Sequence, residues 1–225
     1  ASNGVIIITT KRGALGAKFG VDYNGSAGIS QINRRADNLS SGEFRGLVQS
    51  HFDASHPAQS LLGTADTDWQ DEIFQDAFYQ DHNLSLHGSA GDLPYRISLG
   101  YTDRDGLLKT DNFNRITTAL NLNPRFMDNK LQMNLSGKYM QDKNQFADQG
   151  AIGSAVFFDP TQPVYSGNSN YGGYFTWLNN DGTPSTLSPD NPLALLEQTD
   201  NNSTVNRYIL GAEIDYRLFF LEDLR

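Results

Sequence analysis

Apolar and polar residues alternate with a period of two along six stretches of the chain. In the clearest stretch, Lys18–Gln31, Phe19, Val21 and Tyr23 alternate with charged, amide and small residues. Strict alternation predicts β-strands that have one apolar and one polar face. The six predicted strands are Lys18–Ile32, His82–Ala90, Tyr95–Asp103, Phe113–Asn123, Lys130–Lys143 and Asn206–Phe219.

The polar faces of these strands are too uniformly polar to line a packed core. Strands of about ten residues with tyrosines near their ends are typical of outer-membrane β-barrels, whose apolar face contacts lipid and whose polar face lines a water-filled interior. We therefore predict an all-β fold, a partial antiparallel transmembrane β-barrel of about six strands. A soluble β-sandwich or small barrel is the alternative, since its strands also have one apolar face. The residues expected to face lipid are Val21, Leu99, Leu120, Leu135 and Ile214.

The connections between the predicted strands alternate in length. Asn33–Gln80 and Asn144–Val205 are long, whereas Gly91–Pro94 and Pro124–Asn129 are tight turns. Outer-membrane barrels have long loops on the outer side and short turns on the periplasmic side. The two long connections are therefore expected on the same, outer side of the membrane, and the first strand is expected to run outward.

The first long connection contains a helix signal. Ser40 and Glu43 have the spacing of a capping box, which marks the start of a helix. Three apolar residues then fall on one helical face, so a short helix is predicted near Ser41–Phe52. These three residues are Phe44, Leu47 and Val48.

Composition excludes several classes of protein. The 225 residues include no cysteine, which excludes disulfides, thiolate metal sites and cysteine nucleophiles. The net charge of −9 argues against nucleic-acid binding, which needs a basic surface. No stretch approaches the ~18 consecutive apolar residues of a transmembrane helix. The short run Val5–Thr10 is apolar without alternation, which predicts a strand buried on both faces.

No constellation of catalytic or metal-binding residues stands out. His51 and His56 lack the spacing of helical metal ligands, and His82 and His87 are expected on opposite faces of one strand. The acidic segment Asp66–Glu72 lacks the glycine of a calcium loop and is expected to be a solvated turn before a helix. No Gly-x-Ser-x-Gly motif occurs. We therefore expect no enzyme activity, no bound metal and no other cofactor.

Several segments, in order along nearly the whole chain, carry a resemblance to one family. The opening Ala1–Gly13 contains Asn-Gly-Val-Ile and ends in Thr-Lys-Arg-Gly. It resembles the last plug-domain segment of the SusC/RagA family of TonB-dependent outer-membrane transporters. Further segments resemble barrel-strand and loop motifs of the same family. They are Trp69–Phe74, His82–Gly88, Tyr95–Tyr101 with Asp105-Gly106, Asp159–Tyr165 and Asn191-Pro192.

The resemblance implies a longer protein, with an N-terminal extension, a TonB box and a plug upstream of Ala1. The whole barrel would have about 22 strands, a size class with a plugged interior. Residues 1–13 would be the C-terminal end of the plug domain, and residues 14–225 the N-terminal part of the barrel. The implied function is TonB-dependent import of a nutrient across the bacterial outer membrane. The implied partners are a SusD-like surface lipoprotein, TonB, outer-membrane lipid and a cargo, either an oligosaccharide or a peptide.

Aromatic residues in the long connections are candidate contacts for the partner or the cargo, because aromatic side chains are common interface anchors. Packing within the loops, or contact with the lipoprotein, is favoured over contact with cargo. The alternative function is a structural or adhesive surface β-protein, whose loops bind ligands without active import. The candidate contact residues are Phe44, Trp69, Tyr171, Tyr174, Phe175 and Trp177.

Overall fold

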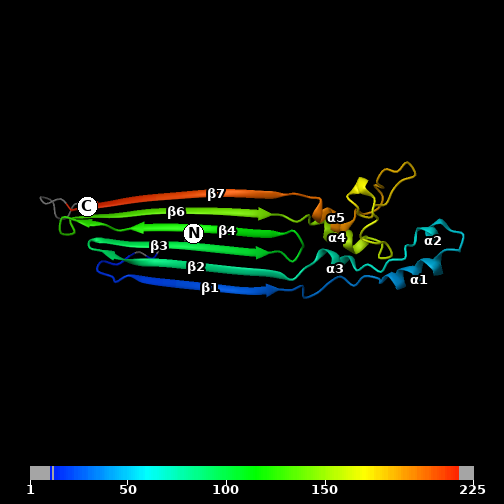
Figure 1. Ribbon diagram of the computed structural model, residues 1–225, viewed down its shortest axis with the longest axis horizontal. Helices are drawn as coiled ribbons and strands as arrows, with labels where there is room; N and C mark the ends of the chain where they lie inside the picture. The colour runs from blue at the N-terminus through cyan, green and yellow to red at the C-terminus, as the bar shows by residue number, and fades with distance from the viewer. Residues whose placement is uncertain (1–10, 12, 218–225) are drawn as a thin grey trace, which may run out of the picture.

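Six long strands form one antiparallel sheet (Figure 1). The computed structural model describes residue 11 and residues 13–217. The order across the sheet is β1-β2-β3-β4-β6-β7, and the two-residue β5 pairs with the start of β6. The strands are β1 Gly20–Ser30, β2 Ala77–Ala90, β3 Leu93–Asp105, β4 Asn112–Leu122, β5 Arg125–Phe126, β6 Leu131–Gln145 and β7 Asn202–Tyr216.

The register of the sheet places residues of the same kind on the same face. Directly paired residues of antiparallel strands lie on one face. Val21 pairs with Leu86, and Leu86 pairs with Ile97. The row continues from Ile97 through Leu120 to Gly137. The five residues predicted to face lipid therefore share one face, which we call the apolar face; the other is the polar face.

The antiparallel sheet confirms the all-β fold class, and the bounds of several strands differ from the predicted ones. β2 begins at Ala77, five residues early, because its first residues continue the ladder with β1 up to Ser30. The turn after β2 contains only Gly91 and Asp92, since Leu93 and Pro94 already belong to β3. Among the described residues, β1 and β7 each have one neighbouring strand, so the sheet is open. Val5–Thr10 lies outside the described residues.

Short helices occupy the connections at one end of the sheet (Figure 1). We call residues 31–76, 106–111 and 146–201 together the helical cap. The two long connections thus lie at the same end of the sheet, as predicted from their parity. No helix among the described residues is both long and apolar enough to cross a membrane. The helices are α1 Ser41–His51, α2 Pro57–Leu61, α3 Trp69–Ile73, α4 Gly150–Phe157, α5 Pro192–Glu197 and the 3-10 helix η1 Ser169–Tyr171.

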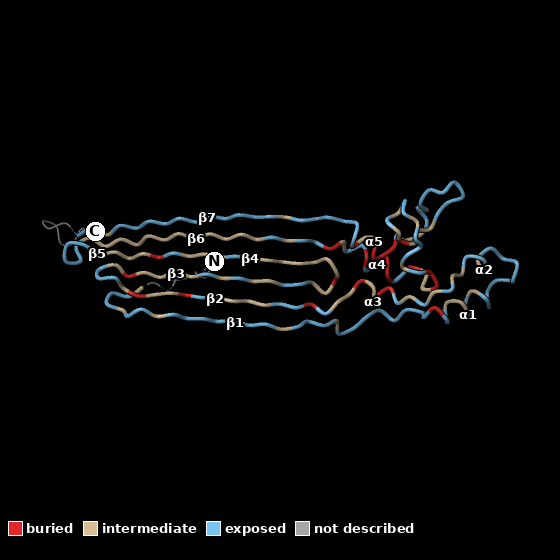
Figure 2. Tube along the Cα trace, in the orientation of Figure 1, coloured by how far each residue is buried: buried red, intermediate tan, exposed pale blue. Residues whose placement is uncertain are grey.

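The buried apolar core lies in the helical cap (Figure 2). Segments far apart in sequence contribute to it, since α3 packs against α4 and α5. Sheets usually bury one face against another layer, whereas the apolar face here keeps large side chains exposed. The buried core cluster is Trp69, Ile73, Leu108, Ala147, Ala151, Ala155, Phe158 and Leu196.

The predicted helix in the first long connection is confirmed as α1. Ser40 and Glu43 form the capping box, because each side chain binds the backbone N–H of the other residue. The hydrogen bonds from Ser40 lower the pKa of the Glu43 carboxyl. The helix ends at His51, one residue before the predicted end, and Phe52 is its C-cap.

Candidate functional site

The two long connections of the helical cap contact each other around Trp69, through a hydrogen bond and ring packing. The Trp69 indole is buried, donates from Nε1 to the Asp159 carbonyl at 3.0 Å, and packs edge-to-face on the Phe158 ring at 4.6 Å between centroids. Asp68 caps α3 by accepting from the Gln70 and Asp71 amides, so this acidic segment starts a helix as predicted. The segment is not fully solvated, however, because its one apolar residue, Trp69, is buried in the core.

A second set of hydrogen bonds joins the residues after α2 to the residues after α4. The Gly63 amide donates to Thr161 Oγ1 at 2.9 Å, and the Thr67 hydroxyl donates to the Gln162 carbonyl at 2.7 Å. A Cβ at Gly63 would lie 2.1 Å from the Thr161 carbonyl oxygen, so only glycine permits this approach. Thr161 is completely buried. The long connections therefore fold as one unit.

Asn191 organises the second long connection from a buried position. Its Oδ1 accepts from the amides of Leu193 and Ala194 and so caps α5. Its Nδ2 donates to the carbonyls of Val164 and Phe175 at 3.0 and 3.2 Å. A buried amide whose oxygen and nitrogen both have partners holds a loop in one arrangement.

The Tyr174 side chain links η1's loop to α5. It is buried, its hydroxyl donates to the Glu197 carboxylate, and its ring lies against Tyr165 with centroids 5.1 Å apart. Burial, and then the hydrogen bond to Glu197, raise the pKa of the Tyr174 hydroxyl. Tyr174 therefore stays neutral and serves as a donor at physiological pH.

The six candidate contact residues divide by burial. Trp69 and Tyr174 are 3% and 8% exposed, so both pack the helical cap itself. Phe44, Tyr171, Phe175 and Trp177 are half-buried. Phe175 connects the core to the surface, because its ring meets Phe158 on one side and Trp177 on the other, both edge-on. Contact of any of the six with a partner stays a prediction.

Several hollows open on the helical cap. A groove of about 610 Å³ lies between the start of α1, residues 35–40, residues 66–70 and the end of α4. A smaller pocket of about 340 Å³ lies beside Tyr171, Trp177 and Gln198. The groove exposes Phe157, one of the aromatic residues of the second long connection, and Val156, which had not been predicted from the sequence. The available signal was the spacing of Ala151, Ala155 and Phe158, which fills one side of a helix and leaves these residues on the other.

Two clusters of charged side chains on the polar face of the sheet form ion pairs. Arg115 makes two hydrogen bonds to the Asp142 carboxylate, at 2.6 and 3.0 Å, and its guanidinium lies 4.9 Å from the Phe113 ring centroid. Asp22 lies 3.5 Å from Arg96 and 3.4 Å from His87. His82 lies on the opposite face from His87, as predicted. Among the described residues, no three His, Asp or Glu side chains gather as a metal site would require.

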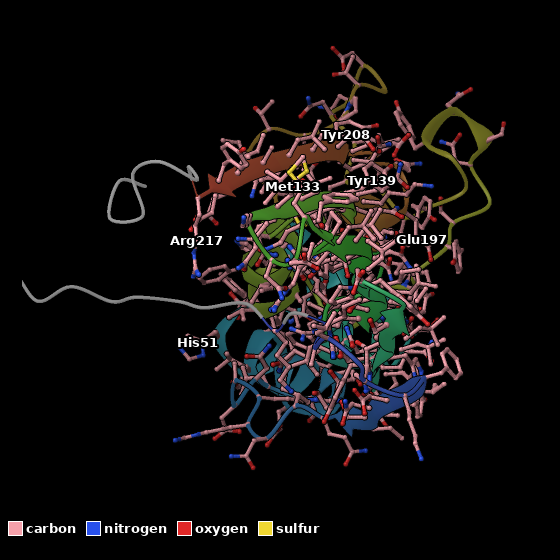
Figure 3. The ribbon with its side chains drawn as sticks, turned by 90° about the vertical axis from the view of Figure 1, so that its left-hand side faces the viewer. His51, Met133, Tyr139, Glu197, Tyr208 and Arg217 are labelled. Carbon is pink, nitrogen blue, oxygen red and sulfur yellow. The ribbon has the colours of Figure 1, made fainter. Side chains whose placement is uncertain are left out.

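On the apolar face, a row of aromatic and amide side chains crosses the sheet about six residues before β6 and β7 reach the helical cap. The Tyr23 hydroxyl and His82 Nδ1 are 2.6 Å apart. The Tyr139 hydroxyl donates to Asn206 at 2.9 Å, and its ring lies beside Tyr208 with centroids 5.0 Å apart (Figure 3). Along β7, the eight steps from Tyr208 to Tyr216 cover about 27 Å, which is of the order of the ~25 Å apolar band of outer-membrane barrels.

Comparison with known proteins identifies the family. Over its whole length the chain is 44% identical to the TonB-dependent receptor SusC of Bacteroides thetaiotaomicron, of which it covers 24%. The chain belongs to the SusC/RagA-type TonB-dependent receptors. It is also 28% identical to TonB-dependent receptor P3 of Formosa agariphila, with 92% of the chain and 20% of that receptor covered. The chain thus spans about a quarter or less of the length of these relatives.

The fold agrees with a solved structure of the same type. The chain superimposes on the RagAB peptide importer in its closed-closed state with a TM-score of 0.52 and 18% identity, covering 82% of this chain and 24% of that one. No protein-family model matches the chain. Receptors of the SusC/RagA type are β-barrel proteins of the bacterial outer membrane and are not enzymes, which confirms both the predicted location and the expectation of no catalysis.

Proposed function

We propose that the whole protein imports a nutrient across the outer membrane by a TonB-dependent mechanism. The observation that carries this proposal is the 44% identity with SusC, which extends over the entire chain. The two-faced sheet supports it, since a polar face with paired charges suits a water-filled interior and the apolar face suits contact with lipid. Closure of this sheet with further strands into a barrel of about 22 strands is part of the proposal.

Within this protein, residues 1–13 would form the end of the plug domain and residues 14–225 the first part of the barrel. Gly13 supports this division, because a Cβ there would lie 2.6 Å from the Tyr95 backbone nitrogen. The chain therefore passes close against the start of β3 before β1 begins. Such close passage suits a connection that enters the barrel from its interior.

The proposed partners are a SusD-like surface lipoprotein, which would cover the helical cap, and TonB, which would act through an upstream segment. Half-exposed aromatic side chains in the cap support contact with the lipoprotein or the cargo, and buried Trp69 and Tyr174 would support them from beneath. The cargo is proposed to be an oligosaccharide or a peptide. The likeness to a peptide importer keeps the second class in the proposal. The half-exposed candidates are Phe44, Tyr171, Phe175 and Trp177.

The test compares uptake with surface binding in whole cells that carry the full-length receptor. Labelled oligosaccharides and labelled peptides are supplied separately, and accumulation inside the outer membrane is measured. Import predicts that accumulation of one class is lost both when the receptor is deleted and when the inner-membrane proton gradient is dissipated. If cells with the intact receptor and an intact proton gradient bind the labelled ligand but never accumulate it, the result would instead support an adhesive surface protein.

A further inference from the structure

Exposed apolar side chains rim the groove between α1 and α4. Phe157 is 79% exposed, Leu39 49% and Val156 37%, and all three line the groove. Phe157 cannot join the core, because Phe158 beside it already fills the buried side of α4. Large apolar side chains that are exposed and close together mark sites of interaction on protein surfaces.

The walls of the same groove are acidic. Three aspartates line it, and the one basic side chain among its lining residues, Arg35, lies 3.7 Å from Asp68 and also pairs with Asp71. The second long connection adds no positive charge, since residues 144–206 include no lysine or arginine. A hollow with walls of one sign concentrates the opposite charge. The three lining aspartates are Asp37, Asp66 and Asp68.

We propose that this groove is the docking site for a polypeptide segment of the surface lipoprotein, in which an apolar side chain is flanked by lysine or arginine. The apolar side chain enters between Phe44 and Phe157, and its basic neighbours face the aspartates. Charge complementarity of this kind accelerates association and fixes the orientation of the partner. The inference rests on the proposed function, from which it takes the lipoprotein as the partner.

The chemistry of the groove disfavours its other possible occupants. Anionic lipid headgroups would be repelled by the three aspartates. The groove also lies in the helical cap, beyond the aromatic row of the apolar face. A neutral sugar would leave the acidic walls without a counter-charge. A peptide segment that is both basic and apolar can cover the apolar side chains at the rim and pair with the aspartates of the walls.

The experiment uses the full-length receptor coexpressed with its SusD-like surface lipoprotein. Phe157→Ser removes an exposed apolar side chain, and Asp37→Lys reverses an exposed wall charge. The matched controls are Leu187→Ser, which alters a side chain 97% exposed outside the groove, and Asp53→Lys, which reverses an exposed charge outside it. The affinity of lipoprotein for receptor is measured at low and high ionic strength.

We expect each groove variant to weaken lipoprotein binding about tenfold, the size of a typical interface anchor. Both controls should stay within about twofold, and high salt should weaken wild-type binding more than binding to Asp37→Lys. Wild-type affinity in both groove variants would overturn the inference while leaving the proposed function intact. If only Phe157→Ser weakened lipoprotein binding, and wild-type binding did not depend on salt, the partner segment would not be a charged one. A lipoprotein that fails to bind the unaltered receptor would overturn the proposed function and this inference together.

Discussion

The sheet and the helical cap use apolar residues in opposite ways. On the apolar face of the sheet, Leu120 and Ile214 remain 40% and 63% exposed, although the ladder of paired strands is continuous. In the cap, Ile73 and Ala151 are 0% exposed within a core built from three connections. The sheet is therefore suited to lipid as its solvent and the cap to water. One chain thus contains an apolar surface suited to lipid and an apolar core suited to water, and the aromatic row at Tyr139 and Tyr208 crosses the sheet about six residues before the cap begins.

The largest expected effect is in the cap, where Trp69→Ala should lower the free energy of unfolding by about 3–5 kcal/mol. The substitution removes a buried ring that packs on Phe158 and an N–H that bonds Asp159. Hydrogen exchange of the α4 and α5 amides in the full-length receptor measures the effect. The strands should keep their wild-type protection, since they share none of this core. Unchanged exchange in α4 and α5 would show that the cap does not depend on this core.

In the sheet, a charged residue introduced on the apolar face should lower the free energy of unfolding more than the same residue introduced on the polar face. Leu120→Arg should destabilise the full-length receptor by about 2–4 kcal/mol if it lies at mid-bilayer. Thr117→Arg, on the polar face of the same strand β4, should cost less than about 1 kcal/mol, because it faces water. Unfolding titrations in lipid measure both variants. The reverse order would mean that the two faces are assigned the wrong way round.

The contrast between sheet and cap also explains what the sequence could predict. Alternation along each strand is local and repeats in six strands, so the strands, their phase and the side that carries the long connections could be predicted. The early start of β2 was missed because Gln80 interrupts the apolar positions, while backbone pairing with β1 continues to Ala77. Pairing of this kind depends on a neighbouring strand and leaves no pattern in β2 itself.

The cap could be predicted far less well. Only α1 has a complete local signal, the capping box of Ser40 and Glu43. Helices as short as α4 and α5 depend on tertiary packing, and their partner Trp69 lies on a distant segment. The same long-range contact buries Trp69, which the sequence offered as a contact residue. The groove is formed by both long connections, so no local pattern could reveal it.

A single hydrogen bond in the cap gives a smaller effect. Tyr174→Phe should cost about 1–2 kcal/mol in the full-length receptor, since it removes the donor to Glu197 while keeping the buried ring. The pKa of Tyr174 is raised in the folded protein. Its contribution is therefore fully present below the unfolded tyrosine pKa of about 10 and is lost as pH rises through the folded value. Exchange in α5 should differ between wild type and Tyr174→Phe at pH 8, and the difference should shrink in strong alkali. If the difference in α5 exchange between wild type and Tyr174→Phe did not change with pH, the effect would come from packing of the ring and not from the hydrogen bond.

The smallest expected effect is confined to α1, which tests how far the cap acts as one unit. Ser40→Ala should cost about 1 kcal/mol of local helix stability, with no change in α4 or α5. The pKa of Glu43 is lowered in the folded state, so its capping contribution is present above about pH 4.3 and is lost as pH falls through the folded value. Exchange of α1 amides, corrected for intrinsic rates, should therefore accelerate in acid, and Glu43→Gln should remove this pH dependence. If Ser40→Ala also loosened α4 and α5, α1 would be part of the cooperative core, although its apolar face is half-exposed.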